Sequence, residues 1–272
     1  MTRDEAEQAL RAIGDAPDDR FPLFDAALAC ALHENPARDP GPAMAQAADA
    51  AARLRARLDR DESPEEALAE TMAGDMQLAG DLMTYEHPDN ADVLAVWARR
   101  RGLPVALAVL YLDAARRCGL PVRGVDFPGH FLLRIETEEG ALALDPFSEG
   151  RVVLPSELSR RAYMTGLTPD VAERLETLMA PASDRAVIMR LQNTIFARAV
   201  QAKDFAQAER SALRRALLDP RDHHPWIDVA AAREGQGALA GALEALARAQ
   251  TLDGGAAIAA RAARERVRMR LN

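Results

Sequence analysis

Apolar residues recur at helical spacing through the first hundred positions, and Gly or Pro marks the ends of the runs. A serine that can accept an amide hydrogen bond and a proline suited to the first turn open the last of these runs at Ser63-Pro64. This part of the chain is expected to form a helical cap or wrap. The other helices predicted here are Glu5–Ile13, Pro22–His33 and Pro42–Leu58.

Two more helices are predicted in the middle of the chain, Val93–Arg100 and Pro104–Cys118. The segment Arg101–Leu103 separates them. The second helix is apolar almost all round in its first three turns, so we expect it to be a buried core element.

From Leu120 onward the period changes to two, which is typical of strands. A short strand follows Pro121, and two more are joined by the turn at 137–140. Phe131, Leu133 and Ile135 alternate with His130, Leu132, Arg134 and Glu136, so the second strand is expected to be half-buried.

Two registers are open for this hairpin. A loop at residues 137–138 sets His130 directly opposite Asp145, whereas a loop at 138–139 sets them diagonally on one face. Both registers put Leu144 on the face of Leu133. Both also bring an imidazole and a carboxylate together.

The last third of the chain is predicted to be helical from about Asp184 and to repeat itself at an offset of 34 residues. Ala206 then aligns with Ala240, and Leu218 with Leu252. The spacing of small residues and the terminal Asp-Pro or Asp-Gly are typical of tetratricopeptide repeats. We predict two repeats and a capping helix, Ala256–Leu271.

Composition and charge narrow the class of protein. The 272 residues suffice for two domains, and the predicted division is 1–176, with a core at about 85–165, and 177–272. A net charge of -8 argues against a nucleic-acid partner. No run approaches the roughly 18 apolar residues of a membrane span, and the N-terminus lacks the apolar region of a signal peptide. With only Cys30 and Cys118, a cytoplasmic location with two reduced thiols is expected.

Candidate chemistry concentrates on His130 and Asp145. A thiol enzyme needs a cysteine at a helix N-terminus, a histidine that exchanges protons and a carboxylate that orients the ring. His130 and Asp145 suit the last two roles, and Gly129 allows a close approach beside the ring. The alternative is structural, an orienting hydrogen bond inside a small sheet.

Specific motifs now suggest a family. The segment Gly119-Leu-Pro-Val122, the strand with His130 and the ending Leu144-Asp-Pro146 resemble the transglutaminase-like (papain-like) core, whose chemistry is Cys-His-Asp. The run RGLPVALAVLYLDAARRCGLPVRGVDFPGHFLLR, with DPFSEGR, is similar to the SirB1-type transglutaminase-like family, in which this domain precedes tetratricopeptide repeats. The resemblance spans roughly Tyr85–Arg151. It implies a mostly helical α+β fold: a helical N-terminal region, a core with a small antiparallel sheet and C-terminal helical repeats.

The resemblance also implies where a nucleophile belongs. In the active enzymes the cysteine opens the helix about 15 residues before the glycine of the Gly-x-Pro turn, and here that position is Pro104. Residues 104–107 contain no nucleophile, so the resemblance implies that the thiol step is lost and that His130 and Asp145 are a remnant pair. Cys118 closes the helix, where the dipole opposes a thiolate, and is interpreted as a structural thiol. Ser148 lacks a nucleophile elbow and is interpreted as a turn residue.

Other polar groups are interpreted conservatively. The adjacent histidines of Asp222-His-His224 are expected to point in different directions in a solvated loop, so no metal is predicted, and no cofactor either. Arg99–Arg101 are interpreted as a solvated face or as partners of carboxylates. The polar run 85–90 stands just before the core, where it can pack over the site.

Two functional hypotheses remain from the sequence. The preferred one is a non-catalytic, cytoplasmic module that binds a protein or peptide through the His130/Asp145 cleft, the repeats or both. The alternative is a hydrolase or acyl transferase in which His130 acts as general base on water and Asp145 orients it. A reactive Cys30 at the site is a third reading. The partner and the oligomeric state are left open.

Overall fold

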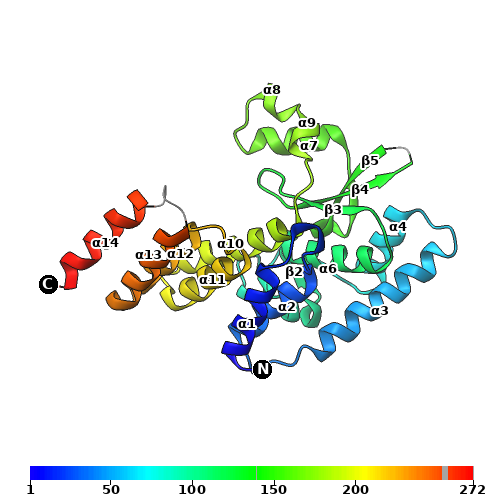
Figure 1. The fold of residues 1–272 in the computed structure, drawn as a ribbon. Coiled ribbons are helices and arrows are strands. Elements are labelled where there is room, and N and C mark those ends of the chain that lie inside the picture. Colours follow the sequence, from blue (N-terminus) through cyan, green and yellow to red (C-terminus); the bar gives the residue numbers. More distant parts are fainter. Residues whose placement is uncertain (139, 253–256, 272) are drawn as a thin grey trace. The chain divides into compact units, whose positions relative to one another are not determined.

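A computed structural model describes residues 1–138, 140–252 and 257–271 (Figure 1). Its internal contacts divide the chain into two compact units. The core unit comprises residues 23–31 and 38–190, and the terminal unit comprises residues 1–22, 32–37 and 191–272. These units do not coincide with the predicted boundary at 176/177, because residues 1–22 group with the C-terminal helices and residues 177–190 with the core.

The helices that precede the sheet begin within two residues of the predicted positions, and those with a predicted end stop within one residue of it. Most of them begin where Gly, Pro or a capping side chain stands, as the sequence indicated. They are α1 (Arg3–Gly14), α2 (Leu23–Glu34), α3 (Gly41–Leu58), α4 (Pro64–Ala69), α5 (Val93–Arg99) and α6 (Pro104–Arg117). Shorter turns accompany them: the 3-10 helices η1 (Asp18–Arg20) and η3 (Pro88–Ala91), and the π-helix η2 (Glu70–Asp75).

Helix α6 is the centre of the core unit, as its apolar composition predicted. Eleven of its 14 residues are buried. Its C-terminus is closed by Gly119 at φ +74°, a left-handed conformation that glycine adopts without strain. Leu120 N–H then donates to Ala115 O at 2.9 Å and Gly119 N–H to Arg116 O at 3.0 Å, the pair of bonds of a Schellman motif. The motif turns the chain directly into the sheet.

The sheet of the core unit is antiparallel, in the order β3-β4-β5-β6. Thr137 pairs with Gly140 and Leu133 with Leu144, so the second of the two predicted registers is the observed one. A separate parallel pair, β1 (Ala79–Gly80) and β2 (Arg101–Gly102), precedes α6. The four strands are β3 (Val122–Val125), β4 (Leu132–Thr137), β5 (Gly140–Asp145) and β6 (Arg151–Val153).

Both faces of this sheet are covered, which corrects the expectation of a half-buried second strand. Leu132 and Leu133 are each 0% exposed although they point to opposite faces. Leu132 lies in an apolar cluster with Leu158 and Ala162 of α7. Helix α6 contacts β3 and β4. The covering helices after β6 are α7 (Pro155–Met164), α8 (Pro169–Ala172) and α9 (Leu175–Leu178).

In the terminal unit, successive helices pack on one another after α10. Helices α11 and α13 begin and end 34 residues apart, the offset found in the sequence. Ala208 and Ala242, which that offset aligns, are both 0% exposed. The assignment of these helices to the tetratricopeptide type stays a prediction. The helices are α10 (Asp184–Gln201), whose residues 184–190 belong to the core unit, α11 (Phe205–Leu218), α12 (His224–Gly235), α13 (Leu239–Leu252) and α14 (Ala257–Leu271).

Across the described residues, no helix is both long and apolar enough to cross a membrane. The first residue of the predicted capping helix, Ala256, lies outside the described residues.

A buried polar cluster joins the end of α2 to α11 within the terminal unit. Arg214 donates to Gln192 Oε1 at 2.7 Å and to Glu34 Oε2 at 2.7 Å. The His33 side chain is fully buried, and its Nδ1 lies 3.5 Å from Arg214 Nη1. Its Nε2 is 3.6 Å from Glu7 Oε1, which is too long for a hydrogen bond. Burial, and then the charge of Arg214, lower the pKa of His33 to about 4.

We predict that His33 makes the protein less stable in mild acid. The unfolded chain binds a proton at His33 near pH 6.5, whereas the folded chain resists it until about pH 4. The stabilisation is therefore complete above pH 6.5 and is lost as the pH falls towards 4, with a loss of about 2 kcal/mol by pH 5. Urea unfolding at pH 8 and pH 5 should show this loss in the wild type and not in His33→Gln. An equal pH dependence in both proteins would refute the prediction.

Candidate functional site

His130 stands in a tight turn immediately before β4. Its backbone N–H donates to Phe127 O at 2.9 Å, and Gly129 closes the turn at φ +72°. A side chain at Gly129 would meet Thr165 Cγ2 at 2.8 Å, so both the backbone angle and the space require glycine. The His130 side chain is 19% exposed. The turn thus holds the ring at the end of the sheet with one edge accessible to water.

Asp145 is the last residue of β5 and is almost completely buried, at 1% exposure. His130 Nε2 lies 2.8 Å from its Oδ1, and Arg161 Nη1 donates to its Oδ2 at 2.9 Å. The backbone N–H groups of Phe147 and Ser148 donate to Oδ1, and Ser148 Oγ donates to Oδ2. The predicted proximity of His130 and Asp145 is therefore present, and their catalytic role stays a prediction.

The charge on Asp145 is held by its partners. Burial raises the pKa of this carboxyl group. The hydrogen bond and charge of His130, followed by those of Arg161, lower the pKa by more than burial raises it. The net pKa is about 2. Asp145 is consequently ionised at neutral pH and can keep the His130 ring oriented with Nε2 towards it.

Sequence reasoning missed Arg161, which lies on α7 and completes the polar cluster. Its guanidinium also pairs with Glu157 at 2.8 Å, and Glu157 pairs with Arg151 of β6 at 2.8 Å. The i, i+4 spacing of Glu157 and Arg161 is a detectable helical ion pair. Its contact with Asp145 depends on how α7 packs against the sheet, for which the sequence carries no signal.

Aromatic contacts connect the site to the polar run 85–90. The rings of His130 and Phe147 are nearly perpendicular, with centroids 6.1 Å apart, and the rings of Tyr85 and Phe147 also form a T-shaped pair, with centroids 5.8 Å apart. A side chain at Gly80 would meet the Phe147 ring at 2.5 Å. Asn90 is fully buried and anchors the run by donating to Thr84 O at 2.7 Å. The run therefore packs beside the site, and Phe147 lies between Tyr85 and the histidine ring.

The predicted nucleophile position is apolar and buried. Pro104 is the first residue of α6 and Leu103 is its N-cap, without a side-chain capping bond. Pro104, Val105, Ala106 and Leu107 are all buried. Proline lacks a backbone N–H and suits this position in a helix. The segment supplies no thiol, hydroxyl or amine that could attack a carbonyl.

A buried tyrosine lies further along α6, with no hydrogen-bond partner for its hydroxyl in the described part of the chain. This is Tyr111, which is 0% exposed and whose pKa is raised by burial and then by the charges of Glu149 and Asp145. We predict that Tyr111→Phe leaves the free energy of unfolding unchanged or raises it by up to about 1 kcal/mol, since an unsatisfied hydroxyl is removed. A loss above 1 kcal/mol in urea unfolding would show that the hydroxyl is in fact bonded.

The remaining candidate nucleophiles have structural surroundings. Cys118 caps the C-terminus of α6, its Sγ lies 3.3 Å from Ala51 O, and burial raises the pKa of its thiol. Cys30 is 4% exposed within α2. Ser148 lies in the 3-10 turn η4 (Pro146–Ser148), where its hydroxyl is bonded to Asp145. Each surrounding fits the structural interpretation, and burial disfavours the thiolate of Cys118.

The arginines before α6 have protein partners. Arg99 pairs with Asp81 at 3.2 Å and donates to Asn90 Oδ1 at 2.7 Å. Arg100 lies over the Trp97 ring, 5.6 Å from its centroid, and Arg101 donates to backbone carbonyls. Arg99 thus acts as the partner of a carboxylate, one of the two roles expected.

The histidine pair in the terminal unit differs from the sequence interpretation. His223 and His224 do not point apart: their rings stack, with centroids 4.0 Å apart and planes 29° from parallel. Together with Asp222 they offer three ligand atoms within 4.8 Å of one another. A metal lies in the plane of each imidazole that binds it, so two stacked rings do not aim at one ion. Asp222 instead bonds His224 Nδ1 at 2.7 Å.

Comparison with known sequences places this geometry in context. The sequence model described as the transglutaminase-like superfamily matches residues 43–193. A UPF0162 protein of Xylella fastidiosa (strain Temecula1) is 35% identical over 166 residues, which cover 60% of this chain and 59% of that protein. A UPF0162 protein of Pseudomonas aeruginosa is 33% identical over 165 residues, 60% of this chain and 55% of that one.

A shorter similarity extends beyond bacteria. The F-box only protein 21 of Mus musculus is 34% identical over 90 residues, which cover 30% of this chain and 14% of that protein. The matches to the Xylella and Pseudomonas proteins span less than two thirds of the length of either relative. No solved structure matches this chain.

Proposed function

Because this chain belongs to the transglutaminase-like superfamily, we propose that it has lost the thiol step and acts as a cytoplasmic, regulatory module that binds a protein or peptide. The finer assignment to the SirB1 type, with tetratricopeptide repeats after the core, is part of this proposal. The bacterial origin of the UPF0162 relatives supports a bacterial setting for it.

The start of α6 carries the proposal. A covalent mechanism needs a nucleophile within reach of the histidine, and the expected position holds Pro104. The buried apolar side chains that follow add no substitute group. Without a covalent intermediate, a difficult amide reaction is not divided into two easier steps. The loss of this one group is sufficient to favour binding over turnover.

The surroundings of Asp145 point in the same direction. In an acid-base pair the carboxylate serves the histidine, whereas here Arg161 also shares its charge at 2.9 Å. Ser148 and two backbone N–H groups use its remaining lone pairs. Asp145 therefore has enough structural bonds to be retained without catalysis.

A hydrolase or acyl transferase that uses His130 on water is the second candidate. The 2.8 Å bond from Nε2 to Asp145 and the partly exposed ring favour it, because they leave Nδ1 for proton exchange. The two candidates differ in one measurable respect: an enzyme loses turnover when His130 is removed, and a binding module has no turnover to lose.

The test combines activity and binding on the full chain. Amide hydrolysis and amine transfer on a mixed peptide library are measured by mass spectrometry for the wild type, His130→Ala and the control Arg174→Gln, which changes an exposed side chain. In parallel, the immobilised proteins select peptides from the same library, and the affinities of selected peptides are measured in solution. We expect saturable binding and no product above the His130→Ala background. Turnover that His130→Ala abolishes, or a failure to select any peptide, would overturn the proposal.

A further inference from the structure

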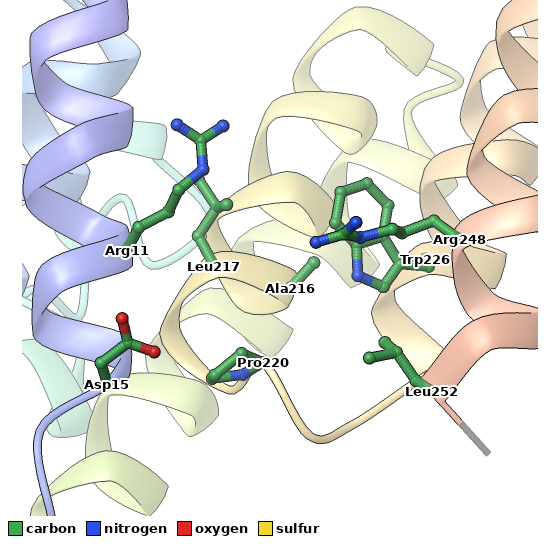
Figure 2. Close-up of a pocket in the computed structure, with 8 residues that line it drawn as sticks. All are labelled: Arg11, Asp15, Ala216, Leu217, Pro220, Trp226, Arg248 and Leu252. Carbon is green, nitrogen blue, oxygen red and sulfur yellow. The ribbon is translucent and has the colours of Figure 1, made fainter.

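A cavity of about 370 Å³ lies within the terminal unit, between α1 and the helices α11 to α13 (Figure 2). This volume is within the range of small-molecule sites. Both apolar and charged groups line the cavity, whereas a packing defect in a hydrophobic core is lined by apolar groups. The lining residues are Arg11, Asp15, Ala216, Leu217, Pro220, Trp226, Arg248 and Leu252.

One wall of the cavity carries a cation that lies over an aromatic ring. The Arg248 guanidinium lies over Trp226, 5.9 Å from the ring centroid, and Figure 2 shows it extending across the indole towards the middle of the cavity. No carboxylate is paired with Arg248 among the described residues. The cation–π contact orders the guanidinium without using its N–H donors in a hydrogen bond to the ring's polar edge, so these donors can serve an anion. This arrangement is suited to a carboxylate, which accepts two parallel hydrogen bonds.

The opposite wall, formed by α1, carries both a paired cation and a carboxylate. Arg11 is paired with Glu7 at 2.9 Å, so its charge is partly compensated, while Asp15 stands one helical turn further along. Among the residues that the structure describes, Arg248 is therefore the cation of the lining without a compensating carboxylate. A chain with a net charge of -8 otherwise repels anions, so an anion that binds here must be held by local contacts.

The floor of the cavity is apolar. Leu217 is buried, and Ala216, Pro220 and Leu252 complete the surface beside the Trp226 ring. Such a surface favours an aliphatic or aromatic group near the anion, because burial of apolar area adds to binding. A small, fully hydrated anion would leave this floor uncovered.

We propose that this cavity binds a carboxylate attached to an aromatic or apolar group, with Arg248 pairing with the carboxylate and Trp226, Leu217 and Leu252 covering the apolar part. Two sources share this chemistry: the C-terminal residue of a peptide and a free small carboxylic acid. If the ligand is the C-terminus of a peptide, the cavity proposal rests on the proposed peptide-binding function. If the ligand is a free small acid, the site exists whether or not that function holds.

The experiment is a titration of the full chain with matched acid and amide probes. The probes are 3-phenylpropionate and its amide, and a pentapeptide ending in phenylalanine, as free acid and as C-terminal amide. Binding is followed by calorimetry and by the fluorescence of Trp226. The second tryptophan, Trp97, is 1% exposed in the core unit and contributes a constant signal. We expect a dissociation constant of about 1 mM or lower for the acids, and binding at least tenfold weaker for the amides.

Variants separate the site from general charge effects. Arg248→Gln should weaken acid binding at least tenfold, because a charge-assisted pair is lost. Arg174→Gln, which removes an exposed cation of the core unit, should change nothing. Tighter binding of the peptide acid identifies a C-terminus as the ligand, and binding of 3-phenylpropionate alone identifies a small acid. Equal affinity for acids and amides would overturn the proposal. So would an absence of binding at an acid concentration tenfold above the expected dissociation constant.

The two proposals can fail separately. If the cavity proposal is refuted, peptides that the library test selects must bind elsewhere on the chain. The converse outcome is that the library yields no peptide while the acid probes still bind the wild type and not Arg248→Gln. That result would refute the peptide-binding function and retain the cavity as a small-acid site.

Discussion

Gly14→Ala is expected to lower the free energy of unfolding by about 3 kcal/mol or more. An added Cβ would stand 2.0 Å from Leu217 O and 3.1 Å from Leu217 C. Both are backbone atoms, so neither can rotate away as a side chain would. Helix α1 would have to move off α11, and the fully buried Ala6 and Leu10 of α1 would lose packing. The measurement is urea unfolding followed by circular dichroism.

A loss of stability in Gly14→Ala would distinguish the clash with α11 from a local effect on helix α1, which has the opposite sign. Alanine normally stabilises a helix by about 1 kcal/mol relative to glycine. Gly74→Ala is the matched control, because its added Cβ meets only the flexible carboxylate of Glu70, at 2.9 Å. The control should change stability by less than about 1 kcal/mol. If Gly14→Ala were as stable as the wild type, the close approach of α1 to α11 would be wrong.

Asp145→Ala is expected to cost about 3 kcal/mol or more in the free energy of unfolding. Its carboxylate accepts bonds from His130, Arg161, Ser148 and two backbone N–H groups, and it is almost completely buried. Removing it leaves these donors without their shared acceptor while the surrounding protein excludes water. Urea unfolding at pH 7 measures the loss.

Two companion variants identify the origin of that loss. Asp145→Asn keeps an acceptor but removes the charge, so its cost should be intermediate. His130→Ala should cost less than about 1 kcal/mol, because the ring is partly exposed and Asp145 retains Arg161. A His130→Ala protein as unstable as Asp145→Ala would contradict this division of roles, and would make the histidine the structural member of the pair.

The stabilisation by Asp145 should also be lost as the pH falls, as for His33, but in a lower pH range. Its folded pKa of about 2 lies below the ordinary value of 3.8. The contribution is therefore present above pH 3.8 and is lost as the pH falls towards 2. His33 titrates at higher pH, so acid unfolding between pH 6.5 and 4 reports on His33 and the further loss below 4 includes Asp145.

The residues of the candidate site differ in how far they were predictable. His130 stands in the turn just before β4 and Asp145 at the end of the neighbouring strand β5, so alternation and turn length bring them together in either register. Arg161 reaches the same carboxylate from α7, and no local pattern encodes that contact. The stacked rings of His223 and His224 likewise differ from expectation, because sequence spacing alone does not set side-chain rotamers.

The sequence by itself determined much of the local structure: where α6 begins and ends, the strands β3, β4 and β5, the 34-residue spacing of α11 and α13, and the absence of a nucleophile at residues 104–107. These properties follow from short-range periodicity, capping and residue chemistry. The sequence did not indicate the strands β1, β2 and β6. Only the tertiary structure decided that Leu132 is buried beneath α7, that α1 joins the C-terminal helices and that Arg248 and Trp226 line a cavity. Such contacts join residues distant in the chain, and their energy depends on shape and burial that no local pattern contains.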